Sequence, residues 1–204
     1  MILYLDSSSP SLNIALISEK NVISQEIERE GDTSLIALDE INKLLKSKNV
    51  RLNDLNKIIL VNGPGSYTGT RICTTIAKTI SFCLGIPVIE VSSLEVIALS
   101  SKEPVVAFID ARRSNVWALA KEGGKNVLEE QFISFNEVLK NFNPQIWHYA
   151  TNKKTTIIDD YELIKPNYRL ICDTFKNREA TPAHLINVNY LKKTEAEENH
   201  DKRD

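Results

Sequence analysis

The sequence predicts an α/β protein made of two duplicated lobes, of which the second is the smaller. First, a strand-like run that ends in an aspartate occurs twice, as Ile2–Asp6 and Val105–Asp110, and the two aspartates are 104 residues apart. Second, each run leads through a polar turn into another strand, and the tripeptide Lys-Asn-Val then follows in both copies, from Lys20 and from Lys125. Third, strand-like runs alternate with helical apolar spacing between the copies. Together these observations predict an internal duplication.

The chain is expected to open with an antiparallel meander. Apolar runs at Met1–Leu5, Leu12–Ile17 and Val22–Ile27 are separated by turn-rich residues. A helix follows over about residues 33–48, with Asp32 as its N-cap. At 100° per residue one face of this helix is apolar and carries Ala37, Leu38, Ile41, Leu44 and Leu45. Ile36 falls nearly opposite that face.

A glycine-rich loop lies between the predicted buried strand Lys57–Val61 and a predicted helix over about 68–84. Such a loop suits an anion at the helix N-terminus or a closely packed neighbour, and the sequence leaves both readings open. It lacks the Gly-Lys-Ser/Thr ending of a Walker loop, and Ser66 lacks the glycine that a nucleophile elbow requires. A dinucleotide-binding reading stays open, because Gly63, Gly65 and Gly69 have roughly the right spacing and Glu90 follows the next strand. Against it, Pro64 removes one N–H donor.

The helix after the loop shows two faces. The face expected to point inward carries Ile72, Ile76, Ile80 and Cys83. The other face mixes small residues, two cations and one aromatic residue, and consists of Arg71, Thr74, Thr75, Lys78, Ser81 and Phe82. Together with Ile36 on the preceding helix, this outer face predicts a helix-mediated interface with another protein.

The remaining elements complete two lobes, assigned to residues 1–102 and 103–191. The predicted strands are Pro87–Val91, Val105–Asp110, Val116–Ala120, Ile146–Tyr149 and Tyr168–Cys172. The predicted helices are Ser92–Leu99, Phe135–Phe142 and Pro182–Leu191. Residues 192–204 are charged and lack apolar spacing, which predicts a disordered tail.

The composition favours a globular protein of a reducing cytoplasm. Of the 204 residues, 42% are hydrophobic and 25% charged, and the net charge is −2. No global positive field therefore attracts nucleic acid or an anionic membrane. The three cysteines, Cys73, Cys83 and Cys172, form no Cys-x-x-Cys pair. No secretion signal or membrane span is recognised.

The sequence offers little catalytic equipment. The histidines, His148, His184 and His200, lack metal-ligand spacing, and no helix carries the histidine pair of a metalloprotease. Asp6 and Asp110 could act as general bases or metal ligands, or they could accept hydrogen bonds from turn amides. The sequence leaves both roles open.

Two hairpins that each place an aspartate at a turn resemble the actin-like ATPase architecture (ASKHA, ribonuclease H-like). The resemblance implies that the turns faced a nucleotide across a cleft, so Asp6, Gly63, Gly65, Ser66 and Asp110 are the expected residual nucleotide or anion contacts. The sequence departs from the active form in two ways. The turn directly after Asp6 contains no glycine, and no glycine occurs anywhere in the sequence after Gly124. We therefore expect a degenerate actin-like fold. The alternative is a small ATP-dependent kinase or ATPase that uses the two aspartates.

A more specific resemblance covers most of the first 120 residues. The run Gly63–Arg71 is similar to the Gly-Pro-Gly-Ser-Phe-Thr-Gly-x-Arg signature of the TsaB family, and Val91-Ser92-Ser93-Leu94 and Ile109-Asp110-Ala111-Arg112 support it. The resemblance implies a non-catalytic dimerisation subunit for threonylcarbamoylation of the tRNA adenosine next to the anticodon. The implied partners are a TsaD-type transferase subunit with metal-binding histidines and a TsaE-type P-loop ATPase. This chain has Asp32-Thr33 where family members usually have a histidine.

The resemblance also sets expectations for ligands and assembly. It implies that the chain requires no cofactor or metal of its own, while ATP or ADP and magnesium belong to the complex. It implies a homodimer when the chain is alone, with tRNA bound only through the complex and no contact with a membrane. The outer helix face described above is the expected contact surface.

Overall fold

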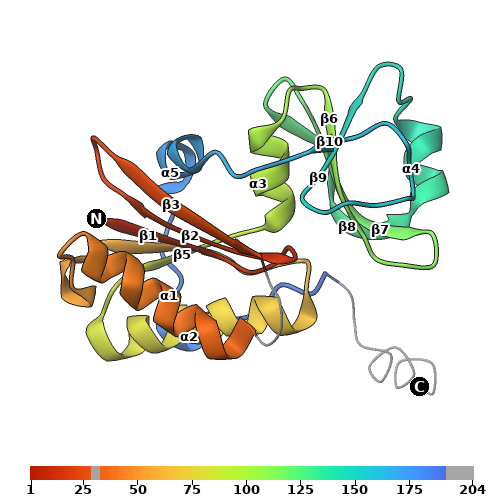
Figure 1. Cartoon of the computed structure of the whole chain (residues 1–204). Helices are drawn as coiled ribbons and strands as arrows, with labels where there is room; N and C mark the ends of the chain where they lie inside the picture. Colours follow the sequence, from red (N-terminus) through yellow and green to blue (C-terminus); the bar gives the residue numbers. More distant parts are fainter. Residues whose placement is uncertain (29–32, 192–204) are drawn as a thin grey trace.

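A computed structural model describes residues 1–28 and 33–191, which form two lobes, each built around a five-stranded sheet (Figure 1). In the first lobe the strand order is β3-β2-β1-β4-β5. Its strands are β1 (Ile2–Asp6), β2 (Ser11–Ile17), β3 (Val22–Glu28), β4 (Lys57–Val61) and β5 (Val88–Val91). The first three form an antiparallel meander, whereas β4 and β5 run parallel to β1. The predicted meander is confirmed.

The second lobe repeats this topology strand for strand. Its order is β10-β9-β6-β7-β8, with antiparallel pairs β6–β7 and β7–β8 and parallel pairs β6–β9 and β9–β10. The strands are β6 (Val105–Asp110), β7 (Asn115–Glu122), β8 (Lys125–Ser134), β9 (His148–Thr151) and β10 (Glu162–Leu163). In both lobes the central strand is the one that ends in an aspartate, Asp6 or Asp110. The predicted duplication is therefore a duplication of topology.

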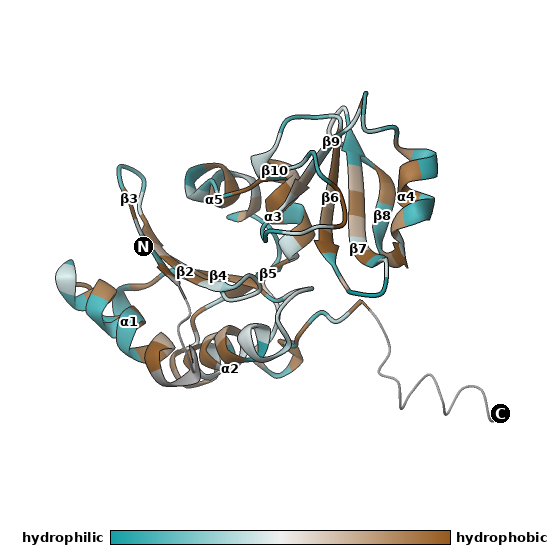
Figure 2. Cartoon of the chain, turned by 45° about the vertical axis from the view of Figure 1, so that its right-hand side comes forward, coloured by the Kyte–Doolittle hydropathy of each residue, from teal (hydrophilic) through white to brown (hydrophobic). Residues whose placement is uncertain are grey.

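Helices cover both faces of the first sheet (Figure 1). The alternation of side chains along a strand gives the sheet two apolar faces, as where Leu3 and Leu5 of β1 point to one core and Tyr4 to the other. The first core lies under α1 (Thr33–Ser47) and α2 (Tyr67–Leu84). The second core is closed by α3 (Ser93–Ser100) and α5 (Tyr168–Phe175). Figure 2 shows that α1 and α5 each carry both hydrophilic and hydrophobic residues.

The second lobe has fewer helices than the first. One face of its sheet packs on α4 (Phe135–Asn141), and the other packs on α3. The segment between β9 and β10, residues 152–161, is fully described and contains no helix. The corresponding segment of the first lobe holds the 18-residue α2. The second lobe is thus the reduced one.

Helix α3 is shared by both lobes. Val96 packs in the second core of lobe one, while Leu94, Ile97 and Ala98 pack against the β6–β7 side of lobe two. After β10 the chain returns to the first lobe, where Ile171 of α5 joins the same core as Val96. Each sheet is thus followed by a helix that contacts the first lobe, and α3 also contacts the second.

Two predicted elements near the C-terminus are wrong. Tyr168–Cys172 was predicted as a strand, but it begins α5, where Asn167 caps the helix and accepts a hydrogen bond from the Leu170 amide. Pro182–Leu191 was predicted as a helix, but only a short 3-10 turn (Ala183–Leu185) forms there. Contacts with lobe one hold the residues after this turn, as described below. Residues 103–191 were predicted to form the second lobe, but α5 and the residues around Ile186 lie against the first.

The inward face of α2 also differs from the prediction. Cys73, Ala77 and Ile80 are buried, whereas Cys83 is exposed. The buried stripe is thus rotated by about one residue from the predicted one, and Ile72 and Ile76 pack at its side. Among the described helices, none combines the length and the apolar character needed to cross a bilayer. The predicted Asp32 cap and the 192–204 tail lie outside the described residues.

Candidate functional site

The glycine loop between β4 and α2 packs tightly against its own chain. A Cβ atom on Gly63 would lie 2.6 Å from the carbonyl oxygen of Asn189, and one on Gly65 would overlap the carbonyl group of Ser8. The Ser66 amide donates a hydrogen bond of 2.7 Å to that same Ser8 carbonyl. The sequence left open whether the glycines serve anion binding or close packing. The structure shows close packing, because the Ser8 turn and the Asn189 segment both approach the loop backbone directly.

Asp6 lies in this packed region and is 3% exposed. Its carboxylate accepts hydrogen bonds from the Ser8 amide at 2.8 Å, the Ser8 hydroxyl at 2.7 Å and the Tyr4 hydroxyl at 3.2 Å. Burial raises the pKa of Tyr4 well above its usual value, and the neighbouring Asp6 charge raises it further. Asp6 therefore stabilises the turn between β1 and β2, which is the turn-cap role that the sequence left open.

Asp110 occupies the equivalent place in lobe two but is exposed. One carboxylate oxygen accepts a 2.7 Å hydrogen bond from the Arg112 amide, and the other lies 3.4 Å from the Thr155 hydroxyl. These contacts join the loops that follow the parallel strands β6 and β9. Asp110 also stabilises a turn, and it remains accessible from the space between the lobes.

A cavity of about 820 Å³ separates the lobes. Of the residues expected to contact a nucleotide or an anion, Gly65, Ser66 and Asp110 line it, whereas Asp6 and Gly63 do not. Arg112 and Lys153 add two cations on the lobe-two side, which sequence reasoning had not singled out. Among the described residues, no group of three or more histidine, cysteine or carboxylate side chains could hold a metal ion.

The outer side of α2 carries two different stripes, and the first is covered by the chain's own C-terminal segment, residues 184–190. Lys78 donates to the carbonyl oxygens of His184 at 3.2 Å and Ile186 at 3.0 Å. Thr74 and Ser81 share its face of the helix and are buried, although they were predicted to lie on the exposed face. The cover comes from residues more than 100 positions away, so helical periodicity could not reveal it.

The second stripe of α2 is exposed and continues onto α1. Phe82 is 79% exposed, Thr75 is exposed, and Leu38 of α1 is 53% exposed. Leu38 was predicted to face inward and Ile36 outward, yet Ile36 is half-buried. A groove of about 420 Å³ lies between the two helices; we call it the α1–α2 groove, and it is lined by Leu38, Tyr67, Thr68, Arg71, Ile72, Thr75 and Ile76. The predicted interface face is thus narrower than expected and is centred on this groove.

Arg71 is one of the lining residues of the groove. Its guanidinium carbon lies 3.8 Å from the centre of the Tyr67 ring and 5.8 Å from that of Tyr190. Its Nε donates a 2.7 Å hydrogen bond to the Tyr190 hydroxyl. The two tyrosine rings are 5.9 Å apart, so the cation is held by both.

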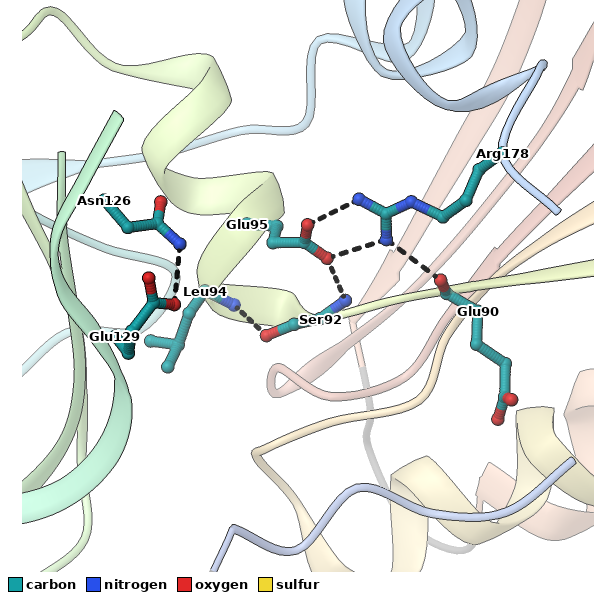
Figure 3. Close-up of polar contacts among 7 residues, drawn as sticks. All are labelled: Glu90, Ser92, Leu94, Glu95, Asn126, Glu129 and Arg178. Atoms are coloured by element: carbon teal, nitrogen blue, oxygen red, sulfur yellow. Dashed lines mark hydrogen bonds and ion pairs between the residues drawn. The ribbon is translucent and has the colours of Figure 1, made fainter. Parts of the chain in front are cut away.

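A polar network at the start of α3 fixes the chain as it leaves α5 (Figure 3). The Ser92 amide donates to Glu95 at 3.0 Å, and the Leu94 amide donates to the Ser92 hydroxyl at 3.1 Å, which together cap the helix. Arg178 binds both oxygens of Glu95, at 2.6 Å and 3.1 Å. Nearby on β8, burial raises the pKa of Glu130. This network ties the segment after α5 to α3.

Known proteins resemble the chain over most of its length. A family model described as "TsaD: tRNA N6-adenosine threonylcarbamoyltransferase" matches residues 32–197. The chain is 37% identical over 142 residues to the tRNA threonylcarbamoyladenosine biosynthesis protein TsaB of Bacillus subtilis, covering 68% of this chain and 62% of that protein. It is 32% identical over 123 residues to TsaB of Haemophilus influenzae, covering 57% of this chain and 51% of that protein. The chain thus spans about half to three-fifths of the length of these two relatives.

Longer but more distant matches cover nearly the whole chain. TsaB of Buchnera aphidicola from Acyrthosiphon pisum is 23% identical, covering 94% of this chain and 97% of that protein. The solved structure "YeaZ from Pseudomonas aeruginosa" superposes with a TM-score of 0.75 at 24% identity, covering 93% of this chain and 99% of that one. A second solved structure, described as similar to that protein, superposes with a TM-score of 0.75 at 22% identity, covering 94% of this chain and 99% of that one. These likenesses, with the duplicated topology, establish the actin-like fold.

Proposed function

This chain belongs to the TsaB family, and we propose that it acts in the biosynthesis of threonylcarbamoyladenosine in tRNA, the process for which its relatives are named. Its role in this proposal is that of a non-catalytic subunit, which binds a TsaD-type transferase through α1 and α2. The transferase carries out the chemistry, a TsaE-type ATPase assists it, and tRNA contacts this chain only through the complex. The chain needs no cofactor of its own, pairs with itself when alone, and works in the cytoplasm.

One observation carries the non-catalytic part of the proposal: the groups of lobe one that would meet a phosphate are bonded to each other. The Ser66 amide donates to the Ser8 carbonyl, and the Ser8 amide donates to Asp6. Gly65 lies against Ser8 so closely that even a methyl group would not fit. A phosphate at this turn would have to separate two segments that are already satisfied, which would cost the desolvation of both.

The exposed face of α1 and α2 supports the binding part. Leu38, which is 53% exposed, lines the apolar α1–α2 groove, and Phe82, which is 79% exposed, lies further along the exposed stripe of α2. Exposed apolar surface of this kind is typical of protein-binding sites, and burial of one large side chain contributes about 1.5–3 kcal/mol. The match to the TsaD family model supports a partner with the same fold, since related folds can pair through equivalent helices.

The test is the affinity of the purified chain for the TsaD-type subunit of the same organism, measured by calorimetry. We expect Phe82→Asp and Thr75→Arg each to weaken binding at least about 30-fold, because each places a charge in a desolvated contact. Ile146→Asp is the matched control, since Ile146 is 65% exposed in the second lobe, away from this face. If Phe82→Asp and Thr75→Arg both bind as tightly as Ile146→Asp, the proposed face is wrong.

The catalytic alternative rests on the cavity between the lobes, which at about 820 Å³ has the size of a small-ligand site and is lined by Asp110. It requires magnesium-dependent ATP turnover by the chain alone, and Asp110→Asn would abolish that turnover. We expect no such turnover, and we expect threonylcarbamoylation of tRNA by the transferase to depend on added chain. Turnover that Asp110→Asn removes would refute the scaffold proposal.

A further inference from the structure

Arg71 lines the α1–α2 groove, and two tyrosines hold its side chain in one orientation. Tyr67 lies one helical turn before it and stacks on the guanidinium, while Tyr190 accepts the hydrogen bond from its Nε. Arginine side chains on a surface usually lose considerable rotamer freedom when they bind a partner. Here the contacts within the chain have already restricted that freedom. The guanidinium is still exposed, and a guanidinium with five N–H donors keeps donors for an external group.

The restraint on Arg71 comes from far along the sequence. Tyr190 lies 119 residues after Arg71 and is positioned by the C-terminal segment. Lys78 anchors this segment through the carbonyl groups of His184 and Ile186, and the Asn189 amide donates to the carbonyl oxygen of Asn62 at 2.9 Å. Residues 184–190 therefore bind Lys78 on one stripe of α2 and also place Tyr190 against Arg71 on the other stripe.

The groove itself is apolar apart from this cation. Leu38, Ile72 and Ile76 line it together with hydroxyl-bearing residues, and Arg71 is its one charged lining residue within the described chain. A complementary surface therefore has apolar side chains for the groove and one carboxylate for Arg71. A planar guanidinium binds a carboxylate through two parallel hydrogen bonds, which fixes the register of the partner as well as adding affinity.

We propose that Arg71, oriented by Tyr67 and Tyr190, binds an acidic side chain on an apolar helix face of the TsaD-type partner. This inference rests on the proposed function and names the chemistry that the binding face recognises. A second copy of this chain would present the same lining residues, none of which is acidic. RNA would satisfy the cation with a phosphate but would leave the apolar groove without a complementary surface.

The experiment measures the dissociation constant for the purified partner subunit at several salt concentrations. We expect Arg71→Met to weaken binding at least about tenfold at low salt, because a buried charge pair is lost. The salt dependence of binding should fall as well, because the remaining contacts are apolar and are not screened. Arg71→Lys keeps the charge but loses the fork and the Tyr190 bond, so it should lie between Arg71→Met and the native chain. Tyr190→Phe removes only the hydroxyl and should weaken binding less than Arg71→Met. Lys140→Met is the control and should bind like the native chain, since Lys140 is an exposed cation on α4 in the second lobe.

The outcomes separate this inference from the proposed function. Native-like binding by Arg71→Met, with Phe82→Asp still disruptive, would overturn the inference and leave the scaffold proposal intact. Weaker binding with an unchanged salt dependence would also overturn it, since a merely structural role for Arg71 predicts that result. The inference is likewise overturned if Arg71→Met changes only self-association of the chain, or only tRNA binding by the isolated chain. If neither Arg71→Met nor Phe82→Asp affects binding, the proposed face itself fails.

Discussion

Replacing Gly65 with alanine tests whether the glycine loop exists to let the chain pack on itself. The added methyl group would overlap the Ser8 carbonyl oxygen and lie 2.9 Å from both the carbonyl carbon and the Cβ of Ser8. All three atoms belong to a buried turn, so the backbone must move. Overpacking of this kind costs about 1–3 kcal/mol, and loss of the bond from the Ser66 amide to Ser8 adds about 1–3 kcal/mol. We therefore expect Gly65→Ala to lower the free energy of unfolding by about 2–6 kcal/mol.

Urea unfolding followed by tryptophan fluorescence measures this change. Gly85→Ala is the matched control, because Gly85 ends the same helix in a left-handed conformation, with φ +67°, and has no atom within 4 Å of an added Cβ. That control should cost only the backbone strain of a non-glycine residue, about 1–2 kcal/mol. If Gly65→Ala is no more destabilising than Gly85→Ala, crowding at Ser8 is not the reason for the glycine.

Two further predictions concern the C-terminal segment and the start of α3. Lys78→Met removes the donor to the carbonyl groups of His184 and Ile186, so we expect about 1–2 kcal/mol of destabilisation and faster amide exchange in residues 184–190; unchanged exchange would contradict it. Glu130→Gln is expected to be more stable than the native chain at pH 7. Burial raises the folded-state pKa of Glu130, so the native chain gains stability as the pH falls through that pKa and the difference disappears in acid. A difference that grows on acidification would refute this reasoning.

The elements that the sequence predicts well are those specified by local pattern. The meander, the strand–glycine loop–helix unit and the echo of Ile2–Asp6 in Val105–Asp110 depend on alternation, turn residues and repetition, all of which lie within short windows. Tyr168–Cys172 is ambiguous for the same reason, because four of its five residues are apolar or aromatic and such a short run suits a strand as well as a helix. Here the Asn167 cap and burial of Ile171 decide for the helix.

The exposed stripe of α2, which we propose as the binding face, was only partly predictable from the sequence. Phe82 and Thr75 lie on the outer side of α2 as expected, since helical periodicity is sufficient to place them. Thr74 and Ser81 do not: both are buried, on the stripe of α2 where Lys78 binds the carbonyl groups of His184 and Ile186. That segment stays extended through contacts with Asn62 and α2, which override the local preference of its residues for a helix. No local pattern contains this information.

The sharing of α3 has a consequence for motion. Enzymes with two lobes around a cleft commonly close on their substrate by hinge bending, which requires one connection to flex. Here the connecting helix α3 is packed into both lobes, with Val96 in a core of the first lobe and Leu94 and Ile97 in a core of the second. Bending would expose part of one core, at about 25 cal/mol for each Å² of apolar surface uncovered. We therefore expect the two lobes to keep a fixed orientation and the cavity between them to keep a constant width. Such rigidity suits a scaffold subunit that supports a partner protein and undergoes no domain closure itself.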